Sequence, residues 1–299
     1  MVAPAQGEGR SLAMRVIVTG ANGQLGSALV ALLSARPADS VLGVDLPDVD
    51  ITDPVCVAAV FDSFAPDVVI NCAAWTAVDD AETKEELALR VNAEGPRVLA
   101  AQCEVSDAWL VQISTDYVFA GDATAPYAET AAGDPRSAYG RTKLAGEVAV
   151  HSVLPTRSYI VRTAWLYGLQ GTNFVKTMLK FEKERENVSV VTDQIGQPTY
   201  AGDLAAQIVA LLDTRPAAGI FHATNSGQCS WFEFTQAIFT EIGADPTRVL
   251  PTDSAAFVRP APRPAYSVLG HDAWAAAGIP EMRDWREALT AAFADGLTA

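Results

Sequence analysis

Residues 15–26 read RVIVTGANGQLG, a short run of β-branched residues that leads directly into three spaced glycines. The run Arg15–Thr19 predicts a buried strand, and Gln24–Leu33 has the apolar spacing of a helix. Glycines between a strand and a helix permit positive φ angles and let the backbone approach a pyrophosphate at the helix N-terminus. The segment Gly20–Gly26 therefore predicts the first βα turn of a dinucleotide-binding fold.

The rest of the first half continues this alternation of short apolar runs and longer helical patterns. Runs rich in Val and Ile that are separated by helices are typical of a parallel sheet covered on both faces. We therefore predict an α/β fold with a Rossmann-like, doubly wound parallel sheet. The expected strands are Val41–Asp45, Pro66–Asn71, Trp109–Ser114 and Ser158–Arg162, and the expected helices are Glu82–Glu104 and Ser137–Ser152.

After residue 165 the pattern loosens, which favours a smaller α/β substrate-binding lobe from the C-terminal half. We expect an NAD(P)-binding Rossmann domain at 14–165 and a mainly substrate-binding lobe at 166–299, with some segments returning to the first domain. Residues 1–13 are expected to form a disordered leader. The expected later elements are helices near Asn173–Arg185, Asp203–Leu212 and Trp231–Ile242, strands at 188–191 and Gly219–Ala223, and a last helix from about Asp284.

Charge and composition exclude several classes of partner. The 299 residues carry a formal net charge of −15, which repels nucleic acid and anionic lipid surfaces. No apolar run approaches the ~20 residues that a membrane span needs. The four cysteines are scattered without a C-x-x-C pair, and the three histidines lack metal-ligand spacing. We therefore expect a cytoplasmic protein with reduced cysteines and no metal.

An acidic residue stands where a dinucleotide fold needs one. Asp45 ends the second expected strand, about 20 residues beyond the glycine turn. Its carboxylate is expected to accept hydrogen bonds from the adenosine ribose hydroxyls, and no arginine adjoins it to pair with a 2′-phosphate. The position favours NADH over NADPH and is compatible with the use of both.

Tyr139 and Lys143 lie four residues apart near the start of an expected helix, so their side chains share one face. An ammonium group beside a phenol favours the phenolate and lowers the pKa of the tyrosine. The tyrosine then exchanges a proton with a carbonyl or alcohol oxygen near neutral pH. We predict both as catalytic residues, with Lys143 also holding the nicotinamide ribose.

A third polar motif, STDYVF at residues 114–119, ends another expected strand. Ligands of open α/β sheets bind at the carboxyl ends of the strands. We therefore expect Thr115 to act as a catalytic residue that hydrogen-bonds the substrate oxygen beside Tyr139, and Asp116 to bind sugar hydroxyls.

Together these motifs resemble the extended short-chain dehydrogenase/reductase family and, within it, the dTDP-4-dehydrorhamnose reductase branch. The resemblance runs from about Met14 nearly to the C-terminus, in nine pieces that keep the family order. The pieces are TGANGQLG (19–26), NCAAWTAVDDAE (71–82), VNAEGP (91–96), STDYVF (114–119), YGRTKLAGE (139–147), RTAWLYG (162–168), NFVKTML (173–179), TDQIGQPTY (192–200) and RPAYSVL (263–269).

The resemblance implies roles at matched positions. Trp165 would pack against the sugar, while Gln194 and Pro198 would shape the nucleotide pocket. The implied substrate-binding residues are Thr115, Asp116, Tyr139, Trp165, Gln194 and Pro198. The implied cofactor-binding residues are Gly20, Asn22, Gly23, Gln24, Leu25, Gly26, Asp45, Asp50, Ile51, Ala73, Ala74, Trp75, Thr76, Asn92, Tyr139 and Lys143.

The implied reaction is the NAD(P)H-dependent reduction of the C4 keto group of dTDP-4-dehydro-L-rhamnose, with Tyr139 as the proton donor. The implied partner is a dTDP-linked 4-keto sugar, bound by a monomer or a homodimer. Some members of the branch are described as metal-bridged dimers. One of their acidic positions corresponds to Ala28 here, so the expectation of no metal stands.

Four alternatives are weighed against this interpretation. A nucleotide-sugar 4,6-dehydratase needs a carboxylate pair after the strand-end threonine, but Asp116 is followed by Tyr117. An epimerase is harder to exclude by motif, as is a reductase of another dTDP-keto sugar of the dihydrostreptose type. A non-catalytic NAD(P)-binding regulatory subunit, like that of methionine adenosyltransferase, would tolerate loss of Thr115, Tyr139 and Lys143, all of which are present.

Overall fold

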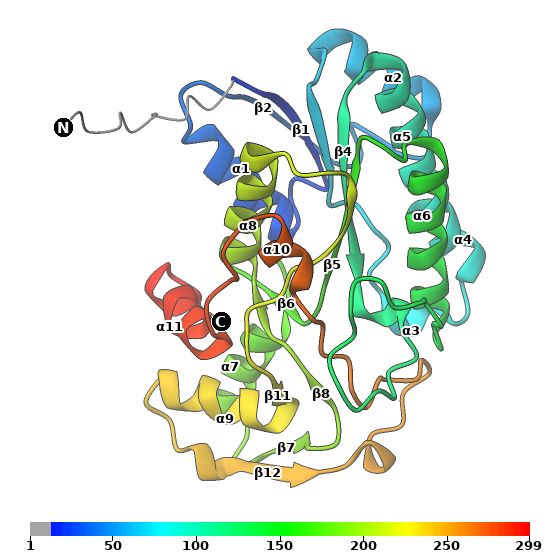
Figure 1. Ribbon diagram of the computed structural model, residues 1–299. Helices are drawn as coiled ribbons and strands as arrows, with labels where there is room; N and C mark the ends of the chain where they lie inside the picture. The colour runs from blue at the N-terminus through cyan, green and yellow to red at the C-terminus, as the bar shows by residue number, and fades with distance from the viewer. Residues whose placement is uncertain (1–12) are drawn as a thin grey trace, which may run out of the picture.

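The computed structural model describes residues 13–299, so the expected leader lies, apart from Ala13, outside the described residues. At its centre is a six-stranded parallel sheet with the order β10-β5-β4-β3-β1-β2 (Figure 1). The prediction of a Rossmann-like parallel sheet is confirmed. Its strands are β1 (Arg15–Thr19), β2 (Ser40–Val44), β3 (Val68–Asn71), β4 (Trp109–Thr115), β5 (Ser158–Thr163) and β10 (Gly219–His222).

The strand order creates a switch point between β1 and β3. The chain passes from β1 outward to β2 and then returns to place β3 on the other side of β1. Gly20, which follows β1, has φ +63°, and a Cβ there would lie only 2.7 Å from the backbone nitrogen of Ala73 after β3. Only glycine lets these two strand ends approach so closely.

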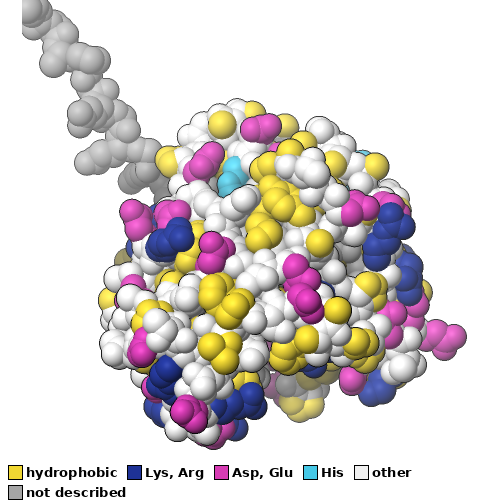
Figure 2. Space-filling view, turned by 90° about the horizontal axis from the view of Figure 1, so that it is seen from below, with side chains coloured by type: hydrophobic (Ala, Val, Ile, Leu, Met, Phe, Trp, Pro, Cys, Tyr) yellow, Lys and Arg dark blue, Asp and Glu magenta, His cyan; other side chains and the backbone are white. Residues whose placement is uncertain are grey.

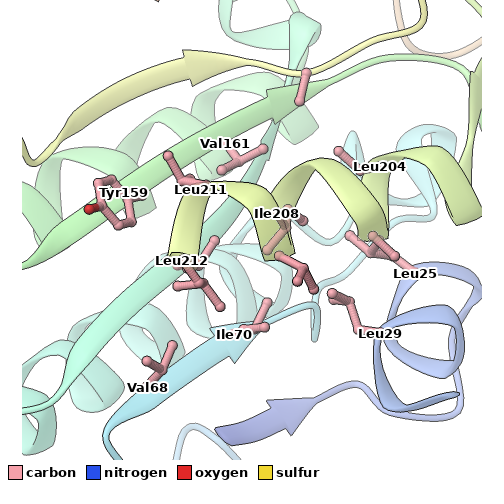
Figure 3. Close-up of a cluster of buried hydrophobic side chains, with 14 of the residues drawn as sticks. Leu25, Leu29, Val68, Ile70, Tyr159, Val161, Leu204, Ile208, Leu211 and Leu212 are labelled. Atoms are coloured by element: carbon pink, nitrogen blue, oxygen red, sulfur yellow. The ribbon is translucent and has the colours of Figure 1, made fainter. Parts of the chain in front are cut away.

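Helices cover both faces of the sheet. On one face α1 (Gln24–Ser34) packs against α8 (Ala201–Thr214), and on the other α5 (Gly95–Ser106) packs between α2 (Pro54–Phe64) and α6 (Ala138–Val153) (Figure 1). Figure 3 shows the apolar cluster on the first face, where leucines of the helices meet valine and isoleucine side chains of the strands. The labelled members are Leu25, Leu29, Val68, Ile70, Tyr159, Val161, Leu204, Ile208, Leu211 and Leu212.

The continuous helix expected over Glu82–Glu104 is wrong in detail. The chain forms α3 (Val78–Ala81), α4 (Glu85–Leu89), a π-helical turn η1 (Arg90–Glu94) and only then α5. Within the π turn, the Asn92 amide is buried and donates to the carbonyl of Trp75 and to the hydroxyl of Thr142. The widened turn therefore directs a polar side chain into the protein, which apolar spacing alone does not reveal.

The second half builds a separate apolar core around Phe234 and Trp285, both fully buried. It also returns to the sheet, because β10 pairs with β5 and α8 packs on α1. Its helices are α7 (Phe174–Glu184), α9 (Trp231–Glu241), α10 (Asp272–Ala276) and α11 (Trp285–Ala294). Its paired strands are β6 (Leu166–Tyr167) with β9 (Thr199–Tyr200), β7 (Val188–Val191) with β12 (Val249–Thr252), and β8 (Ile195–Gly196) with β11 (Cys229–Ser230). The 3₁₀ turns are η2 (Asp116–Val118), η3 (Pro246–Arg248) and η4 (Ser254–Ala256).

Charges of both signs are interspersed on the face shown in Figure 2, where basic side chains gather at a few places. In the part of the chain that the structure describes, no helix has the length and apolarity to cross a bilayer. All four cysteines are free. Across residues 13–299, no group of three His, Cys, Asp or Glu side chains is arranged to hold a metal ion.

We expect Leu211→Ala to lower the free energy of unfolding by about 2–5 kcal/mol, because it leaves a cavity between α8 and the sheet. Leu211 is fully buried, whereas Leu87 on α4 is 53% exposed and provides the matched control. Chemical denaturation measures both variants. Equal losses for Leu211→Ala and Leu87→Ala would contradict the packing described here.

Candidate active site

Two adjoining cavities open at the carboxyl edge of the sheet. The inner cavity, of about 910 Å³, extends from the glycine turn to Tyr139 and Lys143. The outer cavity, of about 760 Å³, is lined mostly by residues of the C-terminal half. Both volumes fall in the range of ordinary ligand sites. The residues that line both are Tyr117, Trp165, Phe174, Trp231 and Arg263.

The N-terminus of α1 faces the inner cavity, and the first amides of the helix, at Gln24 and Leu25, are not capped by a side chain. Gly23 is the N-cap, no side chain caps the helix, and its first turn has no acidic residue. Unpaired N–H groups and the helix dipole make such an end an anion site. A Cβ at Gly26 would lie 2.1 Å from the carbonyl oxygen of Gly20, so the tight turn requires glycine there.

Asp45 lies beside this turn and lines the inner cavity. Its two oxygens accept hydrogen bonds from the backbone N–H groups of Asn22, at 2.9 Å, and Leu46, at 2.8 Å. Asn22 is exposed and is not among the residues that line the cavity, so its expected contact with the cofactor stays a prediction. Its backbone instead ties the glycine turn to Asp45.

Tyr139 and Lys143 occupy successive turns of α6, whose N-terminus is capped by the hydroxyl of Ser137. Both line the inner cavity, and both are buried in the protein without ligands. The Lys143 ammonium donates to the carbonyl oxygen of Ile113 at 2.6 Å, which directs it toward the end of β4. Burial lowers the pKa of Lys143 to about 8, partly offset by the Glu147 carboxylate.

The expectation that Lys143 lowers the pKa of Tyr139 is wrong for the protein without ligands. Burial raises the pKa of Tyr139 to about 12, and the Thr115 hydroxyl offsets this only in part. The free-energy cost of removing a phenolate from water exceeds the stabilisation that the Thr115 hydroxyl gives it. The phenol therefore keeps its proton at neutral pH, as a proton donor must.

Thr115 and Asp116 complete the inner site at the end of β4. The Thr115 hydroxyl donates to Asp116 Oδ1 at 2.9 Å and lies beside the Tyr139 phenol. Burial raises the pKa of Asp116 to about 6, although the nearby Ser267 hydroxyl counteracts the shift. Among residues 13–299, Asp116 Oδ2 has no hydrogen-bond partner. A buried, unpaired acceptor in a ligand cavity is suited to bind a polar group of the ligand.

An aromatic wall separates the two cavities. Trp165 has φ +46°, and its indole stacks on Trp231 with ring centroids 3.5 Å apart and planes 9° apart. Phe174 adds a third ring, 4.3 Å from Trp231. A Cβ at Gly196 would lie 2.5 Å from the Trp165 ring, so the indole is packed on its other side as well. This packing holds Trp165 in an unfavourable backbone conformation.

The outer cavity concentrates positive charge in an acidic protein. Of the charged residues that line it, Arg185, Arg259 and Arg263 are basic and Asp79 is acidic. Because the whole chain has a net charge of −15, this local excess favours an anionic ligand at this place.

The structure brings most residues expected from the sequence to the cavities. Gln194 lines the outer cavity, whereas Pro198 is buried and lines neither of the two. The expected residues that line the inner cavity are Gly20, Gly23, Gln24, Leu25, Gly26, Asp45, Asp50, Ile51, Ala73, Ala74, Thr76, Thr115, Asp116, Tyr139, Lys143 and Trp165.

Two further expected ligands do not line the cavities. Trp75 packs against the buried cluster of Ala81, Ala88, Ala138 and Tyr139, and its indole N–H donates to the carbonyl of Ala77. The Asn92 side chain accepts a hydrogen bond from the backbone N–H of Trp75 at 2.8 Å. It therefore supports the loop after β3 from the side away from the cavity.

Sequence reasoning missed several lining residues. Trp231 has the pattern of a core anchor, yet it lines both cavities. Asn173 caps α7 and donates to the side-chain oxygen of Gln24 at 3.1 Å. Thr163, at the end of β5, has a buried hydroxyl without a partner in the described chain. The position of Thr163 at the end of an expected strand was the one local signal for it. Trp231 and Asn173 reach the cavity through contacts with distant segments, which leave no local signal in the sequence.

A doubly wound sheet with a glycine turn at its switch point, and a Tyr/Lys pair on the same cavity, define an NAD(P)H-dependent oxidoreductase of the short-chain dehydrogenase/reductase type. Residues 14–297 match the family described as RmlD substrate binding domain, and the chain belongs to that family.

Relatives of known name match the chain over nearly its whole length. A dTDP-4-dehydrorhamnose reductase of Streptomyces griseus is 50% identical over 283 residues, which cover 93% of this chain and 93% of that protein. A dTDP-4-keto-6-deoxy-D-glucose reductase of Streptomyces niveus is 50% identical over 279 residues, covering 93% and 96%. A crystal structure of dTDP-4-dehydrorhamnose reductase from Bacillus anthracis in complex with NADP is 42% identical, has a TM-score of 0.91, and covers 95% of this chain and 100% of that one.

Gly26→Ala is expected to weaken binding of NADPH and NADH at least about tenfold, because the added methyl group collides with Gly20 and displaces the turn from the phosphates. Gly219→Ala is the control, since a Cβ there meets no atom within 4 Å. Quenching of tryptophan fluorescence by the cofactor measures both. Wild-type affinity in Gly26→Ala would contradict the assignment of the turn.

Asp116→Asn is expected to change how stability depends on pH. Between pH 3.8 and about 6 the folded protein retains a proton on Asp116 that the unfolded chain has lost, so the free energy of unfolding falls as pH rises through this window. The variant lacks this titration. Its stability relative to wild type should therefore increase across the window by about 3 kcal/mol. Denaturation at a series of pH values tests this, and a constant difference from pH 4 to 7 would refute it.

Proposed function

We propose that the chain reduces the C4 keto group of dTDP-4-dehydro-L-rhamnose, with Tyr139 as the proton donor. The observation that carries this is the shared inner cavity: the free N-terminus of α1 lies at one end and the Thr115, Tyr139 and Lys143 side chains at the other. The relatives named as dTDP-keto-sugar reductases support the substrate class.

The residues present fit a nicotinamide dinucleotide. The uncapped amides at Gln24 and Leu25 would receive the pyrophosphate, and Asp45 and Asp50 would lie along the adenosine half. When bound, NADPH or NADH supplies a hydride for the keto carbon. The prediction that Asp45 favours NADH stays a prediction, and the Bacillus anthracis relative was crystallised with NADP.

The side chains of the inner site then handle the proton. Tyr139, protonated at neutral pH, gives its proton to the C4 oxygen as that oxygen gains negative charge. The Lys143 ammonium stabilises the phenolate that remains, since most of it is charged at neutral pH. On substrate binding, the Thr115 hydroxyl would turn its proton from Asp116 Oδ1 to the same oxygen and hold that oxygen against the phenol. Asp116 Oδ2, buried without a partner in the described chain, accepts a sugar hydroxyl.

The nucleotide end of the substrate is assigned to the outer cavity. Arg259 and Arg263 would pair with the diphosphate, because arginine donors match its oxygens and the rest of the chain is acidic. Trp165 and Trp231 would pack against the sugar where the two cavities meet. Gln194 would contact the nucleotide.

A second candidate is a reductase of a different dTDP-linked 4-keto sugar. The observation that favours it is that a relative with the same 50% identity carries the name dTDP-4-keto-6-deoxy-D-glucose reductase. Measuring kcat/KM with both sugars separates the candidates, since the true substrate is expected to be turned over at least about tenfold more efficiently.

Tyr139→Phe is expected to lower kcat for dTDP-4-dehydro-L-rhamnose by at least about 100-fold while cofactor binding persists, since only the proton donor is removed. Tyr159→Phe serves as the control: this hydroxyl bonds the carbonyl of Pro216 and lines neither cavity. Oxidation of NADPH or NADH is followed by absorbance.

The outcomes decide between catalytic and binding roles. Turnover that collapses in Tyr139→Phe and persists in Tyr159→Phe supports the proposal. A wild-type protein that binds cofactor and reduces neither keto sugar would refute it, in favour of a further keto sugar as substrate or of the non-catalytic subunit.

A further inference from the structure

Asp79 joins two segments that are distant in the sequence. It lies in α3, directly beyond the loop that lines the cofactor end of the inner cavity. Its Oδ1 accepts the backbone N–H of Ala261 at 3.2 Å, and its Oδ2 accepts Nη2 of Arg263 at 3.0 Å. Nη1 of Arg263 donates back to the carbonyl of Ala261 at 3.2 Å. The contacts form a closed ring of one carboxylate, one guanidinium and the backbone N–H and C=O groups of Ala261.

This ring fixes the arginine where the two cavities meet. Arg263 lines both, and its side chain is 23% exposed, against 31% for Asp79. A guanidinium has five N–H donors in one plane. The ring uses two of them, so the other donors stay free for a ligand while the plane of the group is held.

We propose that Asp79 is a positioning residue that orients Arg263 toward the diphosphate of the substrate. The inference rests on the proposed function, which assigns the nucleotide end to the outer cavity. Asp79 acts through Arg263, because a planar donor set binds an anion well only when its orientation is held before binding.

Asp79 has two opposing effects on anion binding, so the direction in which its removal changes the affinity is informative. A carboxylate near the site repels the diphosphate and partly neutralises Arg263. If that repulsion were its main effect, removing the charge would tighten anion binding. If orientation dominates, as we infer, removing it weakens binding.

The test is calorimetric binding of dTDP to the full chain. Asp79→Asn is expected to bind dTDP about tenfold more weakly than wild type, with unchanged affinity for NADPH. Asp80→Asn is the matched control, because the Asp80 side chain forms a surface ion pair with Lys84 at 3.2 Å and is 59% exposed. In an Arg263→Gln background, Asp79→Asn should cause no further loss, which a merely structural role would not produce.

Each result has a defined meaning. Equal or tighter dTDP binding by Asp79→Asn overturns the inference and leaves the proposed function intact. No dTDP binding by wild type overturns both. Should Asp79→Asn fail to fold, Arg263→Lys keeps the charge but loses the planar donor pair. It is expected to bind dTDP about tenfold more weakly, and wild-type affinity would overturn the inference.

Discussion

The close approach of two strand ends at Gly20 and Ala73 is the constraint on which the rest of the site depends. Gly20 has no side chain, so the turn after β1 can lie directly against the backbone that follows β3. From this turn the chain enters α1. The free amides of α1 are thereby placed at one end of the inner cavity. Gly26 carries the same constraint one helical turn further, where the helix crosses the Gly20 carbonyl. A larger residue at either place would displace an entire wall of the cavity.

Burial then sets the proton affinities at the other end of the cavity. The same dry surroundings raise the pKa values of Tyr139 and Asp116 and lower that of Lys143. All three shifts disfavour charge, which is the mark of desolvation rather than of pairing. At neutral pH the Tyr139 phenol is protonated, whereas Asp116, with a pKa of about 6, is mostly ionised and Lys143 is mostly charged. Charge that develops on a bound ligand would be stabilised by few groups. Those few groups consequently carry a large share of the electrostatic work.

The sequence predicted the fold well because the deciding signals are local. The glycine turn, the strand at Arg15–Thr19 and the Tyr139/Lys143 spacing are all readable within a few residues. What was missed depends on contacts between distant segments. Trp231 stacks on Trp165, which lies in a distant segment of the sequence. The π turn places the Asn92 amide where it hydrogen-bonds the carbonyl of Trp75. The predicted direction of the Tyr139 pKa shift was wrong for a related reason. A sequence shows that a charged residue is near the tyrosine, but not how far the phenol is buried from water.

The return of the chain to the sheet has a consequence for how this architecture can be varied. β10 and α8 come from the half that also forms the outer cavity, yet they complete the sheet and its cover. The outer cavity is therefore not a module appended to the end of a finished unit. A chimaera made by exchanging everything after β5 would replace the edge strand of the sheet and the helix that packs on α1, so the apolar core of the first half would have to fit foreign side chains. Ligand preference in this scaffold is better altered by grafting individual loops between elements than by joining halves of two proteins.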